Sequence, residues 1–223
     1  MSNYIFESHK KALKSRKEYF INGVLLFVND PLPEDVDLLN VKKRIEKAVP
    51  KNLFHNLDYI FIGDFPELKL RDVESVYLRG AIYITHENQT EDSIYKSIIH
   101  ELAHSIETTF GGKIYEDNNV AAEFVGKRKQ LRSILKTHGY EFEDPSVFIR
   151  IEYNPQFDKF LYQEVGYDLL NQLCVGLFVS PYAATSLREY FANGFEHYYL
   201  DDADYLKKTS PRLFSKIYHL TNK

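Results

Sequence analysis

The chain of 223 residues has a single cysteine, Cys174, one methionine and no tryptophan. One cysteine cannot form an internal disulfide, which excludes the disulfide-stabilised class of small secreted domains. The first 25 residues also lack the apolar segment of a signal peptide and contain only the basic stretch 9–17. We therefore expect a protein of a reducing, cytoplasmic compartment.

Long hydrophobic runs and an excess of one charge are missing as well. No apolar run approaches the roughly 20 residues of a membrane helix, because even 173–182 is interrupted by Gly176 and Pro181. The 28 Lys and Arg residues stand against 32 Asp and Glu residues, a net charge of −4 that is too balanced for non-specific binding to nucleic acid. The sequence thus predicts neither a membrane partner nor a nucleic-acid partner.

The composition is that of a globular protein, with 44% hydrophobic and 15% aromatic residues, enough for a sizeable core. Short apolar runs bounded by turn residues predict strands, and one amphipathic run ending at Pro50, with Asp37 able to cap it, predicts a helix. The expected strands are 24–28, 58–62, 75–78 and 81–85, and the expected helix is 35–48.

The best-marked helix is central, at 91–109, with Thr90 as N-cap and Gly111-Gly112 as terminator. After it, the pattern predicts a helix at 120–135, an acidic, proline-containing loop at 140–155, and mostly helix from 160 onward with a break at 180–181. We expect an α+β fold in one domain, with a β-rich lobe (1–112) that includes the central helix and a helical lobe (113–223).

The central helix carries a His-Glu-x-x-His motif at His100, Glu101 and His104. Residues one turn apart share a helix face, so both imidazoles can bind one Zn²⁺, and Glu101 lies where it could take a proton from a zinc-bound water. The alternative is that the three residues are ordinary polar positions on a solvent-facing helix surface. The motif favours a zinc centre with Glu101 as general base.

A catalytic zinc needs a third protein ligand, and the position six residues after His104 is Phe110, which excludes a third histidine there. Two glutamates compete. Glu123 follows at a spacing found in zinc aminopeptidases, whereas Glu189 lies much further along the chain. Spacing alone leaves both open.

Residues 182–195, YAATSLREYFANGF, resemble the third-ligand segment of the anthrax lethal factor-like zinc metallopeptidases, which include Pro-Pro endopeptidases. In that family a Glu opens a Glu-aromatic-Phe-Ala-Glu-small-Phe helix and a Tyr stands seven residues before it. The resemblance implies a zincin-like fold, Glu189 as the third zinc ligand, and Tyr182 as a hydroxyl donor to the substrate carbonyl oxygen. The family's second Glu is replaced by Asn193, whose side-chain carbonyl could orient a ligand imidazole.

We therefore expect a zinc metalloendopeptidase that holds one Zn²⁺ and hydrolyses a protein or peptide substrate, which pairs with 81–85 as the edge strand. The alternatives are an inactive zinc-binding structural or interaction protein and an aminopeptidase-like enzyme that uses Glu123. Among weaker features, His197 reads as a surface residue and Cys174 as an inert core thiol. Three basic stretches are expected to be solvated helix faces: 10–17, 41–47 and 126–132.

Overall fold

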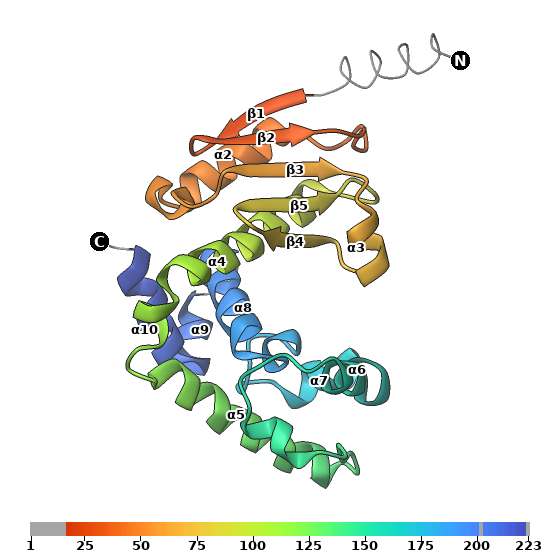
Figure 1. Ribbon diagram of the computed structural model, residues 1–223. Helices are drawn as coiled ribbons and strands as arrows, with labels where there is room; N and C mark the ends of the chain where they lie inside the picture. Colours follow the sequence, from red (N-terminus) through yellow and green to blue (C-terminus); the bar gives the residue numbers. More distant parts are fainter. Residues whose placement is uncertain (1–16, 201–202, 222–223) are drawn as a thin grey trace. The chain divides into compact units, whose positions relative to one another are not determined.

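The computed structural model describes residues 17–200 and 203–221 (Figure 1). Its elements confirm a mixed α+β architecture, with all strands before the central helix and helices alone after it within the described residues. The chain separates into two compact units, the first ending at Ile106 and the second beginning at Glu107, whereas the sequence placed the boundary between lobes at 112.

The first unit contains a five-stranded sheet in the order β1-β2-β3-β5-β4 (Figure 1). The central pairs β2–β3 and β3–β5 are parallel, and the outer pairs β1–β2 and β4–β5 are antiparallel. Every predicted strand is present, the second of them shifted by one residue. The strands are β1 (Lys17–Ile21), β2 (Val24–Val28), β3 (Tyr59–Gly63), β4 (Ser75–Leu78) and β5 (Ala81–Thr85).

The expectation that 81–85 forms the sheet edge is wrong, because β5 lies between β3 and β4. The reason is the turn at Arg79-Gly80, where both residues have positive φ (49° and 83°). This conformation is typical of a tight two-residue hairpin, so β4 folds directly against β5 and occupies the edge itself.

Strand β1 was not predicted. It carries charged and exposed residues, as edge strands often do, and pairs with β2 through a hairpin turn at Asn22-Gly23 with φ of 51° and 93°. The basic stretch 10–17 was expected to be a helix face. Its residues 10–16 lie outside the described residues, and Lys17 begins β1.

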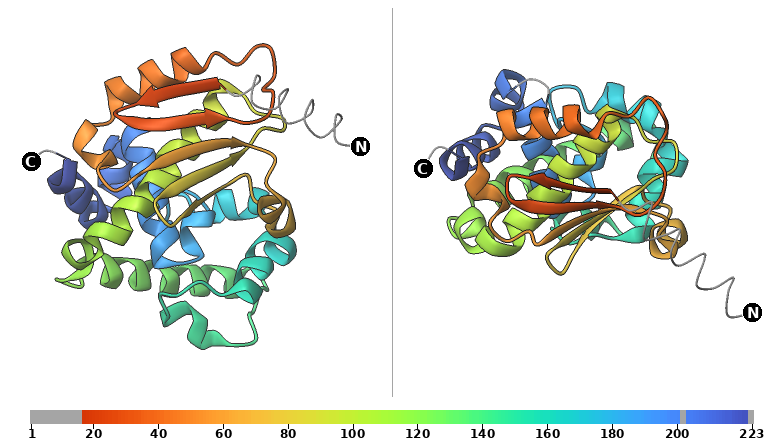
Figure 2. Two further views of the ribbon diagram at one scale, coloured as in Figure 1. Left: turned by 45° about the horizontal axis from the view of Figure 1, so that its top comes forward. Right: turned by 90° about the horizontal axis from the view of Figure 1, so that it is seen from above.

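Helix α2 (Leu38–Ala48) begins three residues after the predicted start at 35, because Asp37 acts as its N-cap, as the sequence suggested: the Asp37 side chain accepts a hydrogen bond from the backbone N–H of Leu39 (2.9 Å). Its apolar stripe is buried, and its basic residues lie outside that stripe, as expected for 41–47, with Lys42 and Arg44 in ion pairs. Arg44 pairs with Asp92 (2.7 Å), so α2 lies beside the beginning of the central helix (Figure 2). A short helix, α3 (Pro66–Arg71), and a 3₁₀ turn (Lys51–Phe54) complete this unit.

The central helix, α4 (Glu91–Tyr115), begins as predicted, where the Thr90 and Ser93 side chains each accept a hydrogen bond from the other's backbone N–H (3.1 and 2.8 Å). It ends six residues later than predicted, because it continues through Gly111 and Gly112. The Gly111-Gly112 pair predicted a helix end, but contacts of later residues stabilise a further turn. Ile114 is fully buried, and the Tyr115 hydroxyl donates to Glu107 (2.5 Å).

The second unit is helical, as predicted (Figure 2). Its longer helices are interrupted by the segment 140–155 and at Ser180-Pro181. Its helices are α5 (Asn119–Thr137), α6 (Pro155–Lys159), α7 (Tyr167–Leu173), α8 (Leu187–Leu200), α9 (Ala203–Thr209) and α10 (Pro211–Thr221), with 3₁₀ turns at Pro145–Ile149 and Tyr182–Ala184 and a π-helical segment at Phe160–Gly166.

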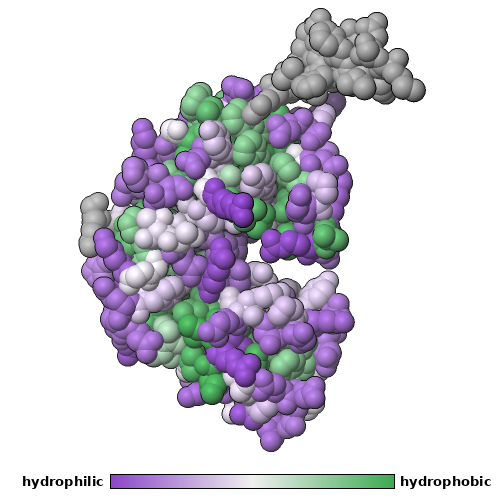
Figure 3. All heavy atoms as spheres, in the orientation of Figure 1, coloured by the Kyte–Doolittle hydropathy of each residue, from purple (hydrophilic) through white to green (hydrophobic). Residues whose placement is uncertain are grey.

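Helices α8 and α10 approach closely at Gly194. A Cβ built there would lie 2.3 Å from Cδ2 of the buried Leu213, so only glycine fits without displacing that side chain. Of the helices in residues 17–200 and 203–221, none combines the length and apolarity needed to cross a membrane. On the face drawn in Figure 3, hydrophilic side chains cover most of the described surface and hydrophobic ones appear in small groups.

Candidate metal centre

His100 and His104 project from the same face of α4, one helical turn apart. Their ring centroids lie 5.0 Å apart with planes at 83°, His104 is buried, and His100 is half-buried. The residues that flank them on the helix, including Ile99 and Ala103, are fully buried. The two imidazoles therefore sit on a helix with apolar surroundings, which does not fit the alternative of a solvent-facing helix surface.

Glu101, between the two histidines, turns toward the sheet and is 5% exposed. Its Oε1 accepts from the Ser75 hydroxyl (2.8 Å) and its Oε2 accepts from the Tyr77 backbone N–H (2.6 Å). Both partners belong to the edge strand β4. Neither residue was predicted to contact the motif, although both lie in a predicted strand shortly before it.

In the second unit, Glu189 occupies the first turn of α8. Its backbone N–H donates to the Ser186 hydroxyl (3.1 Å), and its carbonyl accepts from the Asn193 side-chain amide (2.9 Å). The other side-chain atom of that amide, Oδ1, accepts from the Ser180 hydroxyl (2.6 Å), whose oxygen also accepts from the Ala183 N–H (3.1 Å). Asn193, expected from the sequence to orient a ligand imidazole, instead ties the beginning of α8 to the preceding loop.

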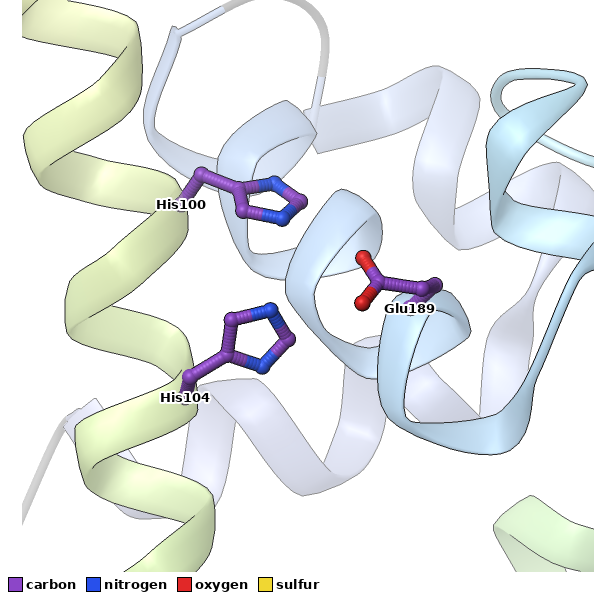
Figure 4. Close-up of side chains that lie close together, drawn as sticks. All are labelled: His100, His104 and Glu189. Atoms are coloured by element: carbon purple, nitrogen blue, oxygen red, sulfur yellow. The ribbon is translucent and has the colours of Figure 1, made fainter. Parts of the chain in front are cut away.

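His100, His104 and Glu189 each offer one ligand atom, and these atoms all lie within 4.8 Å of one another. Figure 4 shows both imidazoles pointing from α4 toward the Glu189 carboxylate. Two imidazole nitrogens and one carboxylate oxygen form a donor set suited to a divalent transition metal, so this group can hold a metal ion.

Glu123, the competing ligand from the sequence, is engaged elsewhere. Its Oε1 accepts from the Tyr190 hydroxyl (2.8 Å) and from the Leu213 N–H (3.2 Å), and its Oε2 accepts from the Arg212 N–H (3.0 Å). These amides belong to the first turn of α10, which leaves N–H groups without intrahelical partners. Glu123 therefore caps α10.

Tyr182 lies half-buried in the 3₁₀ turn that precedes α8. Burial raises the pKa of its hydroxyl well above the usual range, and the negative charge of Glu189 raises it further. The phenol therefore stays protonated at neutral pH and retains its capacity to donate a hydrogen bond.

Two residues of the basic stretch 126–132 contradict the expectation of a solvated helix face: Lys127 is 7% exposed and Arg128 is fully buried. The Lys127 ammonium donates to the backbone carbonyls of Leu177 and Thr209 (2.6 Å for the latter). Burial lowers its pKa to about 8. The side chain thus links α5 to the loop at Leu177 and to the end of α9 at Thr209.

Arg128 extends into the same core, where Nη1 donates to the Arg150 carbonyl (3.2 Å) and lies 3.5 Å from the Thr185 carbonyl. Its guanidinium lies 4.4 Å from the centroid of the Phe157 ring, and burial lowers its pKa to about 10. Through Thr185 it holds the segment between Tyr182 and Glu189. The sequence did contain an indication of this burial, because Lys127 and Arg128 lie three and four residues from apolar residues of α5 and so share their helix face.

The two remaining sequence expectations have different outcomes. Cys174 is buried, as predicted, and burial raises the pKa of its thiol to about 11, so it remains protonated and unreactive. His197, expected at the surface, is half-buried on α8.

None of the protein-family models, curated proteins and solved structures compared with this chain matches it.

Proposed function

We propose that this chain is a zinc-dependent metalloendopeptidase of the zincin type, related to the lethal factor-like metallopeptidases. The observation that carries the proposal is the convergence of the His100 and His104 nitrogens and a Glu189 carboxylate oxygen. Two histidines and one glutamate form the ligand set of a catalytic zinc that keeps one position open for solvent. Bound there, zinc would supply Lewis-acid chemistry and a water that ionises near neutral pH.

Glu101 takes the role of general base. Its carboxylate follows His100 directly in the motif, and each oxygen accepts one hydrogen bond from β4, which leaves lone pairs for a further proton. As the water attacks the peptide carbonyl, Glu101 accepts its proton and then delivers it to the leaving amine. No covalent intermediate with the protein is needed.

Tyr182 stabilises the negative charge that develops on the substrate carbonyl oxygen. Its hydroxyl stays protonated because burial raises its pKa, so it enters the reaction as a hydrogen-bond donor. A donor aimed at such an oxyanion contributes about 3 kcal/mol in other hydrolases.

The substrate backbone pairs with β4. The N–H of Thr85 donates to the Glu74 carbonyl (2.8 Å), and in an antiparallel ladder the direction of these groups alternates. The main-chain groups of Ser75 and the carbonyl of Tyr77 therefore face away from β5, along the outer edge of the sheet, where the Tyr77 N–H already donates to Glu101. An extended peptide added there would lie beside Glu101, which the same strand holds in place.

One observation favours a second function, an inactive metal-binding protein of the same fold. Glu101 has both oxygens engaged by β4, an arrangement that would also suit a purely structural carboxylate. Peptide hydrolysis distinguishes the two functions. An enzyme hydrolyses peptides as wild type and loses this activity in Glu101→Gln, whereas an inactive metal-binding protein hydrolyses no peptide in either form.

The decisive experiment measures zinc per folded protein in the wild type, Glu189→Ala and Glu123→Gln. We expect one zinc ion per chain in the wild type, strong loss in Glu189→Ala, and retention in Glu123→Gln, because Glu123 caps α10. Zinc retained in Glu189→Ala, or lost in Glu123→Gln with the fold intact, would overturn the ligand assignment.

A further inference from the structure

A surface that the proposed mechanism does not use lies beside the beginning of α8. The backbone N–H of Leu187 donates to the Ile151 carbonyl (2.8 Å), two residues before Glu189 on one side and two residues before Tyr153 on the other. Arg128 approaches the Arg150 and Thr185 carbonyls in the same place. The segment that leads into α6 is therefore fixed next to Glu189 within the second unit, where Figure 1 shows α6 and α7 near α8.

Tyrosines and one carboxylate gather on this segment. The Tyr153 hydroxyl donates to Asp158 Oδ2 (2.6 Å), and the Tyr162 and Tyr167 rings meet edge to face with centroids 5.3 Å apart. Tyr153 and Tyr162 are 50% and 59% exposed, so their rings are accessible to a ligand. We call Tyr153, Asp158, Tyr162 and Tyr167 the tyrosine surface.

Charged groups of the tyrosine surface and of the proposed metal site lie close enough to affect the pKa values of the same tyrosines. The charges of Asp158 and Glu189 both raise the pKa of Tyr167, after the larger effect of burial, and the same two carboxylates act on Tyr182. The Tyr167 and Tyr182 phenols are therefore neutral at physiological pH, and the Asp158 carboxylate supplies a negative charge close to both.

The surrounding sequence has the same sign. Residues 140–169 contain seven Asp and Glu against two Lys and Arg, a net charge of −5, whereas the whole chain carries −4. One of the two cations, Arg150, forms an ion pair with Asp144, with 3.4 Å between Nη1 and Oδ2. The negative excess of the chain is thus concentrated in the segment that carries the tyrosine surface.

Exposed aromatic rings beside a carboxylate bind cations, since a ring face attracts positive charge and a carboxylate accepts charged hydrogen bonds. Arginine suits the combination best, because its planar guanidinium stacks on a tyrosine while its fork of N–H groups reaches a carboxylate. Asp158 already accepts one bond from Tyr153, and a carboxylate has room for more.

We propose that the tyrosine surface is a specificity subsite, which selects peptide substrates that carry an arginine side chain near the bond to be cleaved. This inference rests on the proposed peptidase function for its biological meaning, but the recognition of arginine can be tested without cleavage.

The binding test uses the full chain and two fluorescein-labelled alanine-rich nonapeptides with central arginine or central citrulline. Citrulline keeps the shape of arginine and removes its charge. We expect the arginine peptide to bind about tenfold more tightly in fluorescence anisotropy. Equal affinities would overturn the inference.

Two variants locate the effect. Asp158→Asn removes the charge at constant shape, and Tyr162→Leu removes an exposed ring, so each should reduce the preference for arginine at least threefold. Glu141→Gln is the matched control, because Glu141 is an exposed acid of the same segment that pairs with Lys136 (3.3 Å). A preference unchanged in both Asp158→Asn and Tyr162→Leu would show that the tyrosine surface does not select arginine. An equal reduction in Glu141→Gln would assign the preference to the general negative charge of the segment.

Digestion of a random decapeptide library by the zinc-loaded chain separates this inference from the proposed function. We expect arginine to be enriched at one fixed position relative to the cleaved bond, and the enrichment to fall in Asp158→Asn. Cleavage without such enrichment would contradict the subsite and leave the peptidase assignment standing. A library that stays intact would contradict the peptidase assignment, while the anisotropy comparison would still decide whether arginine is recognised.

Discussion

The backbone N–H of Tyr77 donates a 2.6 Å hydrogen bond to Oε2 of Glu101, joining the edge strand of the sheet to the carboxylate between the two motif histidines. The Ser75 hydroxyl binds the other oxygen. The proposed general base is thus positioned by the strand on which the substrate is proposed to lie.

Replacing Glu101 by Gln should remove peptide hydrolysis while leaving zinc content and thermal stability close to wild type. The reason is that the carboxamide can satisfy both neighbours: its oxygen accepts from the Tyr77 N–H, and its NH₂ donates to the Ser75 hydroxyl. The measurement is cleavage of a random decapeptide library, followed by mass spectrometry. Turnover that persists in this variant would show that another group takes the proton.

Gly194→Ala and Gly111→Ala form a matched pair of helix substitutions with opposite expected signs. A Cβ at Gly194 meets Leu213 at 2.3 Å, so this variant should lose about 1–3 kcal/mol of unfolding free energy. A Cβ at Gly111 meets nothing within 4 Å, so that variant should gain about 0.5–1 kcal/mol from helix propensity. Urea denaturation of both variants checks the pair, and destabilisation by Gly111→Ala would show that the extension of α4 is misassigned.

Lys127 should make the protein more stable as the pH rises from about 8 toward 10. Burial lowers its folded pKa to about 8 from an ordinary value of 10.5, so in this range the unfolded chain binds more protons than the folded chain. The free energy of unfolding then increases with pH, by at most about 1.4 kcal/mol per pH unit. Buried tyrosines with raised pKa values, Tyr190 among them, act in the opposite direction above about pH 10.

The effect of Lys127 is isolated by comparing the pH dependence of Lys127→Met with that of the wild type. Lys129→Met is the control, because Lys129 is exposed on the same helix. The Lys127 variant should lack the rise between pH 8 and 10, and the control should keep it. Parallel curves for all three proteins would show that the folded chain does not depress the Lys127 pKa.

Cys174 should react with a disulfide reagent such as Ellman's reagent only when the chain unfolds. Its thiol is 2% exposed and burial raises its pKa to about 11, so both access and thiolate are lacking at pH 8. One thiol per chain should titrate in denaturant and almost none in buffer. Rapid labelling of the native protein would contradict the burial of this helix end.

Local patterns predicted the elements whose stability is itself local. The β-branched runs of β2 and β5 and the cap of α4 at Thr90 were all recognised from short stretches of sequence. The features that were missed depend on distant partners. The strand β1 is formed by pairing with β2, and the last turn of α4 is held by the burial of Ile114, neither of which is visible in the residues themselves.

The candidate site shows the same division. The motif spacing was sufficient to place His100 and His104 on one helix face, whereas the choice between Glu123 and Glu189 rested on a resemblance. Spacing along the chain does not reveal that Glu123 has α10 amides as partners 89 and 90 residues away. The burial of Arg128 was missed for a similar reason, since the carbonyls it binds come from other loops.

Lys127 and Arg128 also differ from most buried cations in the kind of acceptor they use. Their hydrogen-bond acceptors are main-chain carbonyls of Leu177, Thr209, Arg150 and Thr185. A carboxylate partner would be protonated in acid and release its cation, but an amide carbonyl does not titrate in that range. Acidification that protonates the carboxylates of surface ion pairs would therefore leave the hydrogen bond between Arg128 and the Thr185 carbonyl, near Tyr182, in place.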